Sequence, residues 1–206
     1  FTGAVSATGA AVQLTDANAL TLGTVATTGN LTVNSTGALN LGTSTVGGNL
    51  AANSHNGAIT QTGALSVTGT SNLNAGMGDI TLTNAANDFT GAVSATGAVV
   101  QLTDANALTL GTVTTTGNLT VNSTGALNLG TSTVGGNLAA NSHNGAITQT
   151  GALSVTGTSN LNAGTGDITL TNAANDFTGA VSATGAAVQL TDANALTLGT
   201  VATTGN

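Results

Sequence analysis

The side chains that could do acid–base or metal chemistry are two histidines and seven aspartates. His55 and His143 are the only imidazoles, and they stand 88 residues apart at the same place in two nearly identical segments. A histidine can serve as a general base or a metal ligand, but a Ser-His-Asp triad also needs an orienting acid, and none can be assigned here. We therefore interpret both histidines as solvated turn residues and expect no catalytic residue.

The aspartates raise two further kinds of site, calcium binding and glycoside hydrolysis. Gly76-Met77-Gly78-Asp79 and Gly164-Thr165-Gly166-Asp167 are similar to half of a calcium-binding nonapeptide, but calcium takes about six to eight oxygens and the second half is absent. Paired carboxylates could cleave a polysaccharide, yet no aromatic platform for a sugar accompanies them. We expect capping of Asx turns, and neither a metal nor a cofactor, at these positions. The seven are Asp16, Asp79, Asp88, Asp104, Asp167, Asp176 and Asp192.

Threonine pairs suggest an ice-binding face as another possibility. They occur as Thr43-Ser44-Thr45, Thr60-Gln61-Thr62 and Thr81-Leu82-Thr83. Such a face needs a pair on one flat side in every turn of the chain, but the spacing between the pairs varies and Thr114 is replaced by Ala26 in the first copy. We therefore favour a structural role for these threonines.

Two other sets of residues have simple structural explanations. Phenylalanine recurs once per segment and is expected to pack in the core or at a corner, at Phe1, Phe89 and Phe177. Glycosylation sequons matter only if the host glycosylates them, and they begin at Asn30, Asn34, Asn118 and Asn122.

The composition excludes several classes of function. The chain has no lysine or arginine and a formal net charge of −7, so it cannot form ion pairs with nucleic acid or an anionic membrane. It has no cysteine, only 1% aromatic residues and only 3% charged residues, which is atypical of an enzyme. No apolar run is long enough for a membrane-spanning helix. Because Phe1 is not an initiator residue, we expect a processed piece or a fragment of a longer protein.

A repeat of 88 residues organises the chain. Phe1-Thr2-Gly3-Ala4-Val5 returns at Phe89 and again at Phe177, and only three positions differ between the two full copies. The segments are therefore 1–88, 89–176 and the partial 177–206. We expect one continuous structure over residues 1–206 that is built from these copies.

Within each copy the spacing of similar phrases favours a β-solenoid. Gly29-Asn30-Leu31 recurs as Gly48-Asn49-Leu50, and Leu31-Thr32-Val33 alternates aliphatic and polar residues with the period of a strand. Tandem β-sandwich domains of similar size would not repeat themselves internally. We predict an all-β parallel β-helix with about three short strands per coil and about four coils per repeat, advancing about 19 Å, although five shorter coils remain possible. Near-identical copies should close on a whole number of coils, and Asn, Thr and Ser should form ladders between them.

The longer phrases of the chain resemble a known family. Gly78-Asp79-Ile80-Thr81-Leu82-Thr83-Asn84-Ala85-Ala86-Asn87-Asp88-Phe89 and Gly145-Ala146-Ile147-Thr148-Gln149-Thr150-Gly151-Ala152-Leu153 are similar to repeat regions of filamentous haemagglutinin-like large secreted bacterial adhesins. The resemblance implies a right-handed parallel β-helix, a location outside the cell or on its surface, a role in attachment and biofilm, and export by an outer-membrane partner transporter.

These observations predict a non-enzymatic structural segment, a rigid stalk that acts as a spacer in an extracellular adhesin. The alternative is a subunit of a filament or sheath that assembles laterally or end to end, since its low charge leaves little repulsion between neighbours and unpaired strand edges are templates for association. We expect no nucleic-acid partner and no membrane insertion.

Overall fold

The computed structural model describes residues 1–205, and every regular element in them is a β-strand. The chain divides into two compact units, the first spanning Phe1–Asp104 and the second beginning at Ala105. Each unit is a parallel β-solenoid, in which every turn of the backbone pairs with the next turn. The all-β parallel fold is therefore confirmed within each unit, whereas one continuous solenoid over residues 1–206 and its right-handedness stay predictions.

The strands of unit 1 are short and are separated by turns rich in glycine, asparagine and serine, which favour tight changes of direction. They are β1 (Val5–Gly9), β2 (Val12–Asp16), β3 (Leu20–Thr27), β4 (Leu31–Ser35), β5 (Leu39–Asn40), β6 (Thr43–Val46), β7 (Leu50–Asn53), β8 (Ile59–Thr60), β9 (Leu65–Val67), β10 (Ser71–Asn74), β11 (Ile80–Leu82), β12 (Asp88–Phe89), β13 (Val93–Gly97) and β14 (Val100–Asp104).

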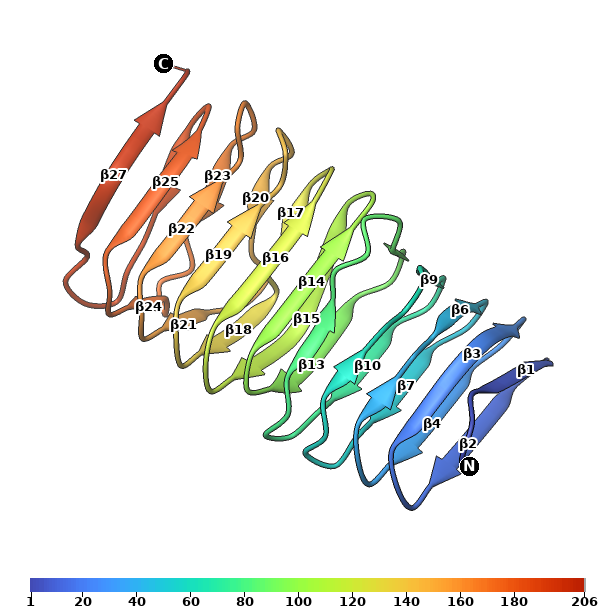
Figure 1. Cartoon of the computed structure of the whole chain (residues 1–206). Helices are drawn as coiled ribbons and strands as arrows, with labels where there is room; N and C mark the ends of the chain where they lie inside the picture. Colours follow the sequence, from blue (N-terminus) through green and yellow to red (C-terminus); the bar gives the residue numbers. More distant parts are fainter. Residues whose placement is uncertain (206) are drawn as a thin grey trace. The chain divides into compact units, whose positions relative to one another are not determined.

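These strands form three parallel sheets, and each turn supplies one segment to each sheet. Sheet A contains β1, the second half of β3, β6, β9 and β12. Sheet B contains β2, β4, β7, β10 and β13, of which β4, β7 and β10 are seen side by side in Figure 1. Sheet C contains the first half of β3, β5, β8, β11 and β14. The strand β3 belongs to two sheets because the chain bends within it.

The length of one turn follows from the register of sheet B. Val12, Leu31, Leu50, Ser71 and Val93 are successive neighbours in this sheet. The first two turns are equally long, and each of the next two is slightly longer than the one before it. The predicted spacing of the phrases and the need for at least one longer turn are both confirmed.

The core of unit 1 is a narrow interior filled from all three sheets. Along β4, Leu31 and Val33 point inward and are 0% exposed, while Thr32 and Asn34 alternate with them on the outer face. Burial of each such aliphatic side chain stabilises the fold by about 1.5–3 kcal/mol. Small cross-section and parallel pairing make long-range packing unnecessary, so a chain without lysine, arginine or tryptophan can fold this way.

One 88-residue repeat does not close on a whole number of turns. Val12 and Val100 hold the same position in two copies, but Val12 pairs with Leu31 in sheet B and Val100 pairs with Ile80 in sheet C. In the same way β1 lies in sheet A and its copy β13 in sheet B. The repeat holds thirteen strand segments, because β3 supplies two, and three segments make one turn, which gives four and one-third turns.

About four turns per repeat is thus confirmed, but the expected whole-number closure is wrong. The physical reason is that each strand of a copy needs only parallel partner strands in the turns before and after it. All three sheets provide such partners. A copy can therefore begin on any sheet.

Unit 2 repeats this organisation. Its strands are β15 (Leu108–Thr115), β16 (Leu119–Ser123), β17 (Leu127–Asn128), β18 (Thr131–Val134), β19 (Leu138–Asn141), β20 (Ile147–Thr148), β21 (Leu153–Val155), β22 (Ser159–Asn162), β23 (Ile168–Leu170), β24 (Asp176–Phe177), β25 (Val181–Gly185), β26 (Val188–Leu190) and β27 (Leu198–Thr203). One sheet contains β16, β19, β22, β25 and β27, a second contains the first half of β15, β17, β20, β23 and β26, and the third contains the second half of β15, β18, β21 and β24.

Candidate interaction surface

The two histidines lie in tight turns, as the sequence predicts. After β7, the backbone N of Gly57 donates to the carbonyl of Ser54 at 2.9 Å, and the central residues His55 and Asn56 have φ values of 47° and 80°. Positive φ at both central positions is the geometry of a type I′ turn. The ring Nδ1 of His55 lies 2.9 Å from the carbonyl oxygen of Ser35 in the preceding turn, so it carries the proton, since a carbonyl only accepts. His143 repeats this arrangement with Ser123 at 2.8 Å.

Five of the seven aspartates accept hydrogen bonds from backbone nitrogens of their own or a neighbouring turn, namely Asp16, Asp79, Asp104, Asp167 and Asp192. Asp176 accepts from the side chain of Asn194 at 3.4 Å. Asp16 accepts from the N-terminal ammonium of Phe1 at 2.8 Å and from the N of Asn18 at 3.2 Å, the second contact being an Asx turn. The ammonium holds the pKa of the Asp16 carboxyl below its usual value, since the hydrogen bond favours the charged form. Asp104, the copy of Asp16, accepts from the N of Phe89 at 2.7 Å.

Asp79 does not follow the expected pattern of capping its own turn. Its Oδ1 accepts from the backbone N of Val99 in the next turn at 3.1 Å, and Asp167 bonds to Ala187 at the same distance. The carboxylate of the Gly-x-Gly-Asp motif thus joins two turns of the solenoid. Within residues 1–205, no group of three or more His, Cys, Asp or Glu side chains is placed to hold a metal ion.

The threonine pairs do not share one face of unit 1. Thr43 and Thr45 point outward from β6 in sheet A, whereas Thr60 and Thr81 are neighbours in sheet C. The phenylalanines differ as well. Phe89 and Phe177 are buried as expected, whereas the expected packing of Phe1 is wrong, since Phe1 is 63% exposed.

Two sets of hydrogen bonds from asparagine side chains connect successive turns at the corners. One is an asparagine ladder, in which Asn30 Oδ1 accepts from the N of Asn49 and Asn49 Oδ1 accepts from the N of Thr70, both at 2.9 Å. This confirms the predicted side-chain ladder and gives Asn30, one of the sequon residues, a structural role. The other is formed by the fully buried Asn87, which the sequence analysis did not single out.

Asn87 satisfies backbone groups that would otherwise be unpaired inside the fold. Its Oδ1 accepts from the N of Leu65 at 2.9 Å and from Gln61 Nε2 at 2.7 Å. Its Nδ2 donates to Gln61 Oε1 at 2.9 Å and to the carbonyls of Leu82 and Thr103, each at 3.2 Å. Asn175 and Gln149 form the same pair in unit 2.

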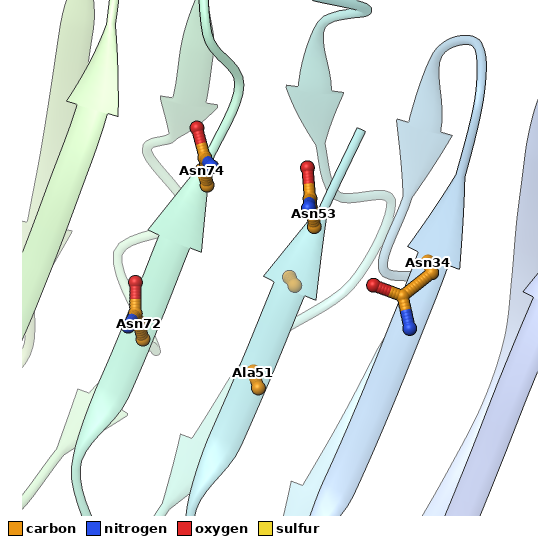
Figure 2. Close-up of a pocket in the computed structure, with 6 residues that line it drawn as sticks. Asn34, Ala51, Asn53, Asn72 and Asn74 are labelled. Carbon is orange, nitrogen blue, oxygen red and sulfur yellow. The ribbon is translucent and has the colours of Figure 1, made fainter. Parts of the chain in front are cut away.

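Asparagines form a row on the outer face of sheet B. Asn34 on β4, Asn53 on β7 and Asn74 on β10 are successive partners in the register of these strands. Asn72 lies two residues before Asn74 on the same strand, and its partner on β7 is Ala51. We call Asn34, Asn53, Asn72, Asn74 and Ala51 the asparagine face of unit 1, and Figure 2 shows its side chains projecting from the three strands.

The asparagine face is hollowed where a small side chain lies between larger ones. The hollow is open to one side, has a volume of about 240 Å³ and is lined by the five residues of the face and Ala52. Ala51 is exposed and lines this hollow. Unit 2 carries the same six residues around a hollow of about 180 Å³, namely Asn122, Ala139, Ala140, Asn141, Asn160 and Asn162.

Several amide groups of this face have no partner inside the protein. Asn53 Oδ1 accepts from the N of His55 at 3.1 Å, and Asn74 Oδ1 accepts from the N of Gly76 at 3.0 Å, so both carbonyls serve their own turns. The side chains of Asn34 and Asn72 make no hydrogen bond to any residue between 1 and 205. The face therefore presents four amide NH₂ groups and the two carbonyl oxygens of Asn34 and Asn72.

Sequence reasoning noted Asn34 only as a glycosylation sequon and missed this face. The signal was present in Leu31-Thr32-Val33-Asn34, Leu50-Ala51-Ala52-Asn53 and Ser71-Asn72-Leu73-Asn74, where asparagine ends three consecutive phrases. The spacings between these phrases equal two successive turn lengths of sheet B. Aligning the phrases by turn rather than by repeat would have placed these asparagines in one row.

No helix in the described part of the chain is long and apolar enough to span a membrane. A search of curated proteins finds no match to this chain, and a search of solved structures finds none either. A family model described as repeats of unknown function, DUF5649, matches residues 8–40, 29–96, 97–127 and 118–184. These matches cover most of both units, and they overlap as expected for a model of a repeated element. The chain therefore belongs to the DUF5649 family of repeats.

Proposed function

We propose that this chain is a structural, non-enzymatic segment of an extracellular bacterial fibre, where its stacked turns act as a rigid spacer. The observation that carries the proposal is the parallel pairing between successive turns in both units. In unit 1, Leu31 pairs with Leu50 and Leu50 with Ser71, and unit 2 repeats this with Leu138 between Leu119 and Ser159.

Such pairing supports a spacer because the length of the solenoid along its axis then grows with the number of residues. Neighbouring parallel strands lie about 4.8 Å apart, so each complete turn adds that length along the solenoid axis. Backbone hydrogen bonds resist stretching and bending at every turn, and their number grows with the number of turns. With four and one-third turns per repeat, one more repeat should add about 21 Å.

The nature of the surface also supports a structural role. Its outward strand positions are small and polar, and both histidines and five of the seven aspartates are bonded to the backbone of their own or adjacent turns. A location outside the cell, a role in attachment and export by a partner transporter belong to the same proposal. They are supported by the resemblance of the repeated phrases to those of filamentous haemagglutinin-like adhesins.

Electron microscopy of chains with added repeats tests the spacer. The full chain is compared with chains carrying one and two further copies of residues 1–88 inserted after residue 88, so that each junction keeps the native order Asp88-Phe89. We expect the particle length to increase in equal steps of about 21 Å at constant width. Particles that grow in all directions, or steps of unequal size, would reject the spacer.

Antibody labelling tests the location separately. Antibodies raised against the full chain should label intact producing cells as strongly as permeabilised cells. Labelling that appears only after permeabilisation would reject the extracellular location while leaving the spacer geometry unaffected.

A further inference from the structure

The asparagine face defined above combines a hollow with unpartnered polar groups. The strands β4, β7 and β10 that carry its asparagines pair with one another, and this pairing sets the distance between the rows. Two of the four asparagines are also oriented by Asx turns. The side-chain oxygens of Asn53 and Asn74 accept from the backbone N of the residue two positions later, His55 and Gly76. A ligand would therefore meet prearranged NH₂ groups at Asn53 and Asn74, which lowers the entropic cost of binding to these two residues.

The hydrogen-bonding groups of the face specify a ligand rich in hydroxyls. Four NH₂ groups donate, and the carbonyls of Asn34 and Asn72 accept. A hydroxyl both donates and accepts, so a pair of adjacent hydroxyls can satisfy both atoms of one amide. The hollow over Ala51, about 240 Å³, is smaller than the pockets of about 300–1,000 Å³ that enclose a drug-sized ligand. It suits the edge of one ring of a longer polymer.

The charge of the chain selects against an ionic ligand. No residue of the face is ionisable, and the protein contains no lysine or arginine that could pair with a sulfate, phosphate or carboxylate. Its net charge of −7 repels anionic polymers at long range. The face also lacks an aromatic ring, so a sugar would be held by its hydroxyl edge and not by stacking.

From these observations we propose that the asparagine face is a binding surface for an uncharged polysaccharide. The edge of one sugar ring enters the hollow over Ala51, Asn34 and Asn72 exchange hydrogen bonds with its hydroxyls, and Asn53 and Asn74 donate to neighbouring rings. Each contact is weak alone, but the same six lining residues recur in unit 2, so one polymer chain or network can be held at several points.

Affinity electrophoresis of the full chain tests this proposal. The acidic protein migrates through native gels cast with dextran, laminarin, galactomannan or hydroxyethyl cellulose, each uncharged, and through gels with carboxymethyl dextran. We expect retardation in at least one neutral polysaccharide and none in the anionic one. Free migration in all four neutral gels, or equal retardation by carboxymethyl dextran, would overturn the proposal.

A variant that removes the amides without altering the strands locates the site. Asn34→Thr and Asn72→Ser, with Asn122→Thr and Asn160→Ser in unit 2, introduce residues that already stand in these rows, since Thr15 is the partner of Asn34 and Ser94 of Asn72. We expect binding about tenfold weaker or more, as each lost hydrogen bond to a ligand reduces affinity several-fold. Thr45→Ala with Thr133→Ala, exposed on other strands, is the matched control and should bind as the parent does.

Two further measurements distinguish other outcomes. On titration with an oligosaccharide of the retained polymer, the side-chain NH₂ resonances of Asn34 and Asn72 should shift in nuclear magnetic resonance spectra. Binding that survives in the fourfold variant would place the site elsewhere and overturn the proposal. Sedimentation of the free protein checks whether the face binds a second copy instead, since dimers that the fourfold variant dissociates would also overturn it.

Discussion

Leu31 and Leu50 are direct partners in sheet B although they lie on different turns of the chain, and each follows the same Gly-Asn dipeptide. The stretch from Leu31 to Asn49 is therefore one complete turn with equivalent ends. This relationship makes the turn, and not the longer sequence repeat, the structural unit of the fold.

Deletion of residues 31–49 should leave a folded protein. The deletion joins Asn30 to Leu50, so that β7 pairs with β2 in place of β4 and the local sequence Gly-Asn-Leu is kept. We expect an unchanged β circular-dichroism spectrum and a cooperative unfolding transition with a smaller denaturant m-value, because less surface is buried. Deletion of residues 31–44 is the control, since it places the outward Thr45 where Leu31 points inward, and should abolish cooperative unfolding. Equal behaviour of the two deletions would contradict the assigned register.

Ser71→Ala should stabilise the protein. Ser71 occupies an inward position of sheet B between Leu50 and Val93, is 1% exposed, and its hydroxyl has no hydrogen-bond partner among the described residues. Removal of a buried unpaired hydroxyl should raise the free energy of unfolding by about 1 kcal/mol, measured by urea denaturation. Ser35→Ala should lower it by a similar amount, because Ser35 Oγ donates to the carbonyl of Gly37 at 2.7 Å. A loss of stability in Ser71→Ala would show that the hydroxyl is needed.

Asn87→Leu should destabilise unit 1 strongly. The substitution keeps the side-chain size but leaves the N of Leu65 and the amide of Gln61 without their partner. We expect a loss of about 2–4 kcal/mol in the free energy of unfolding. Asn72→Leu serves as the matched control, since Asn72 is exposed and unbonded, and should change stability by less than about 0.5 kcal/mol. Similar effects at the two positions would argue against a stabilising role for the buried hydrogen bonds of Asn87.

Gly42→Ala should be costly for reasons of backbone geometry. Gly42 has φ of 60°, and a Cβ there would meet the carbonyl oxygens of Leu22 and Gly23 in the preceding turn. The left-handed conformation and this contact together should cost about 2 kcal/mol or more, read as a lower midpoint of thermal unfolding. Gly3→Ala, around which no atom lies within 4 Å of the added carbon, should leave the midpoint unchanged.

The fold could be predicted largely from local pattern. Alternation in phrases such as Leu31-Thr32-Val33 sets which side chains are buried, and the recurrence of Gly29-Asn30-Leu31 as Gly48-Asn49-Leu50 sets the turn length. The placement of copies on sheets could not be predicted, because Val12 and Val100 are copies of one position in nearly identical sequence but pair in different sheets. The sheet on which a copy begins depends only on the total number of strand segments in a repeat.

The candidate site was less visible in the sequence. Histidine and aspartate drew attention because their chemistry is distinctive, yet His55 and Asp79 bond to backbone groups of adjacent turns. The asparagine face depends on which residues of different turns become partners, as Asn34 and Asn53 do. That information arises from the register between turns and not from any single motif.

A disulfide cross-link between two turns tests the winding of the chain most directly. The protein has no cysteine, so Thr32→Cys and Ala51→Cys introduce the only thiols at two outward positions that are partners in sheet B. Parallel partners lie about 4.8 Å apart, within the range of about 4.4–6.8 Å that a disulfide spans between Cα atoms. Mild oxidation should give an intramolecular cross-link, detected by mass spectrometry of peptides released with proteinase K. The pair Thr32→Cys with Ala52→Cys, whose second residue points into the core, should remain reduced. Failure of the first pair to cross-link within one molecule, or equal cross-linking of both pairs, would contradict the solenoid.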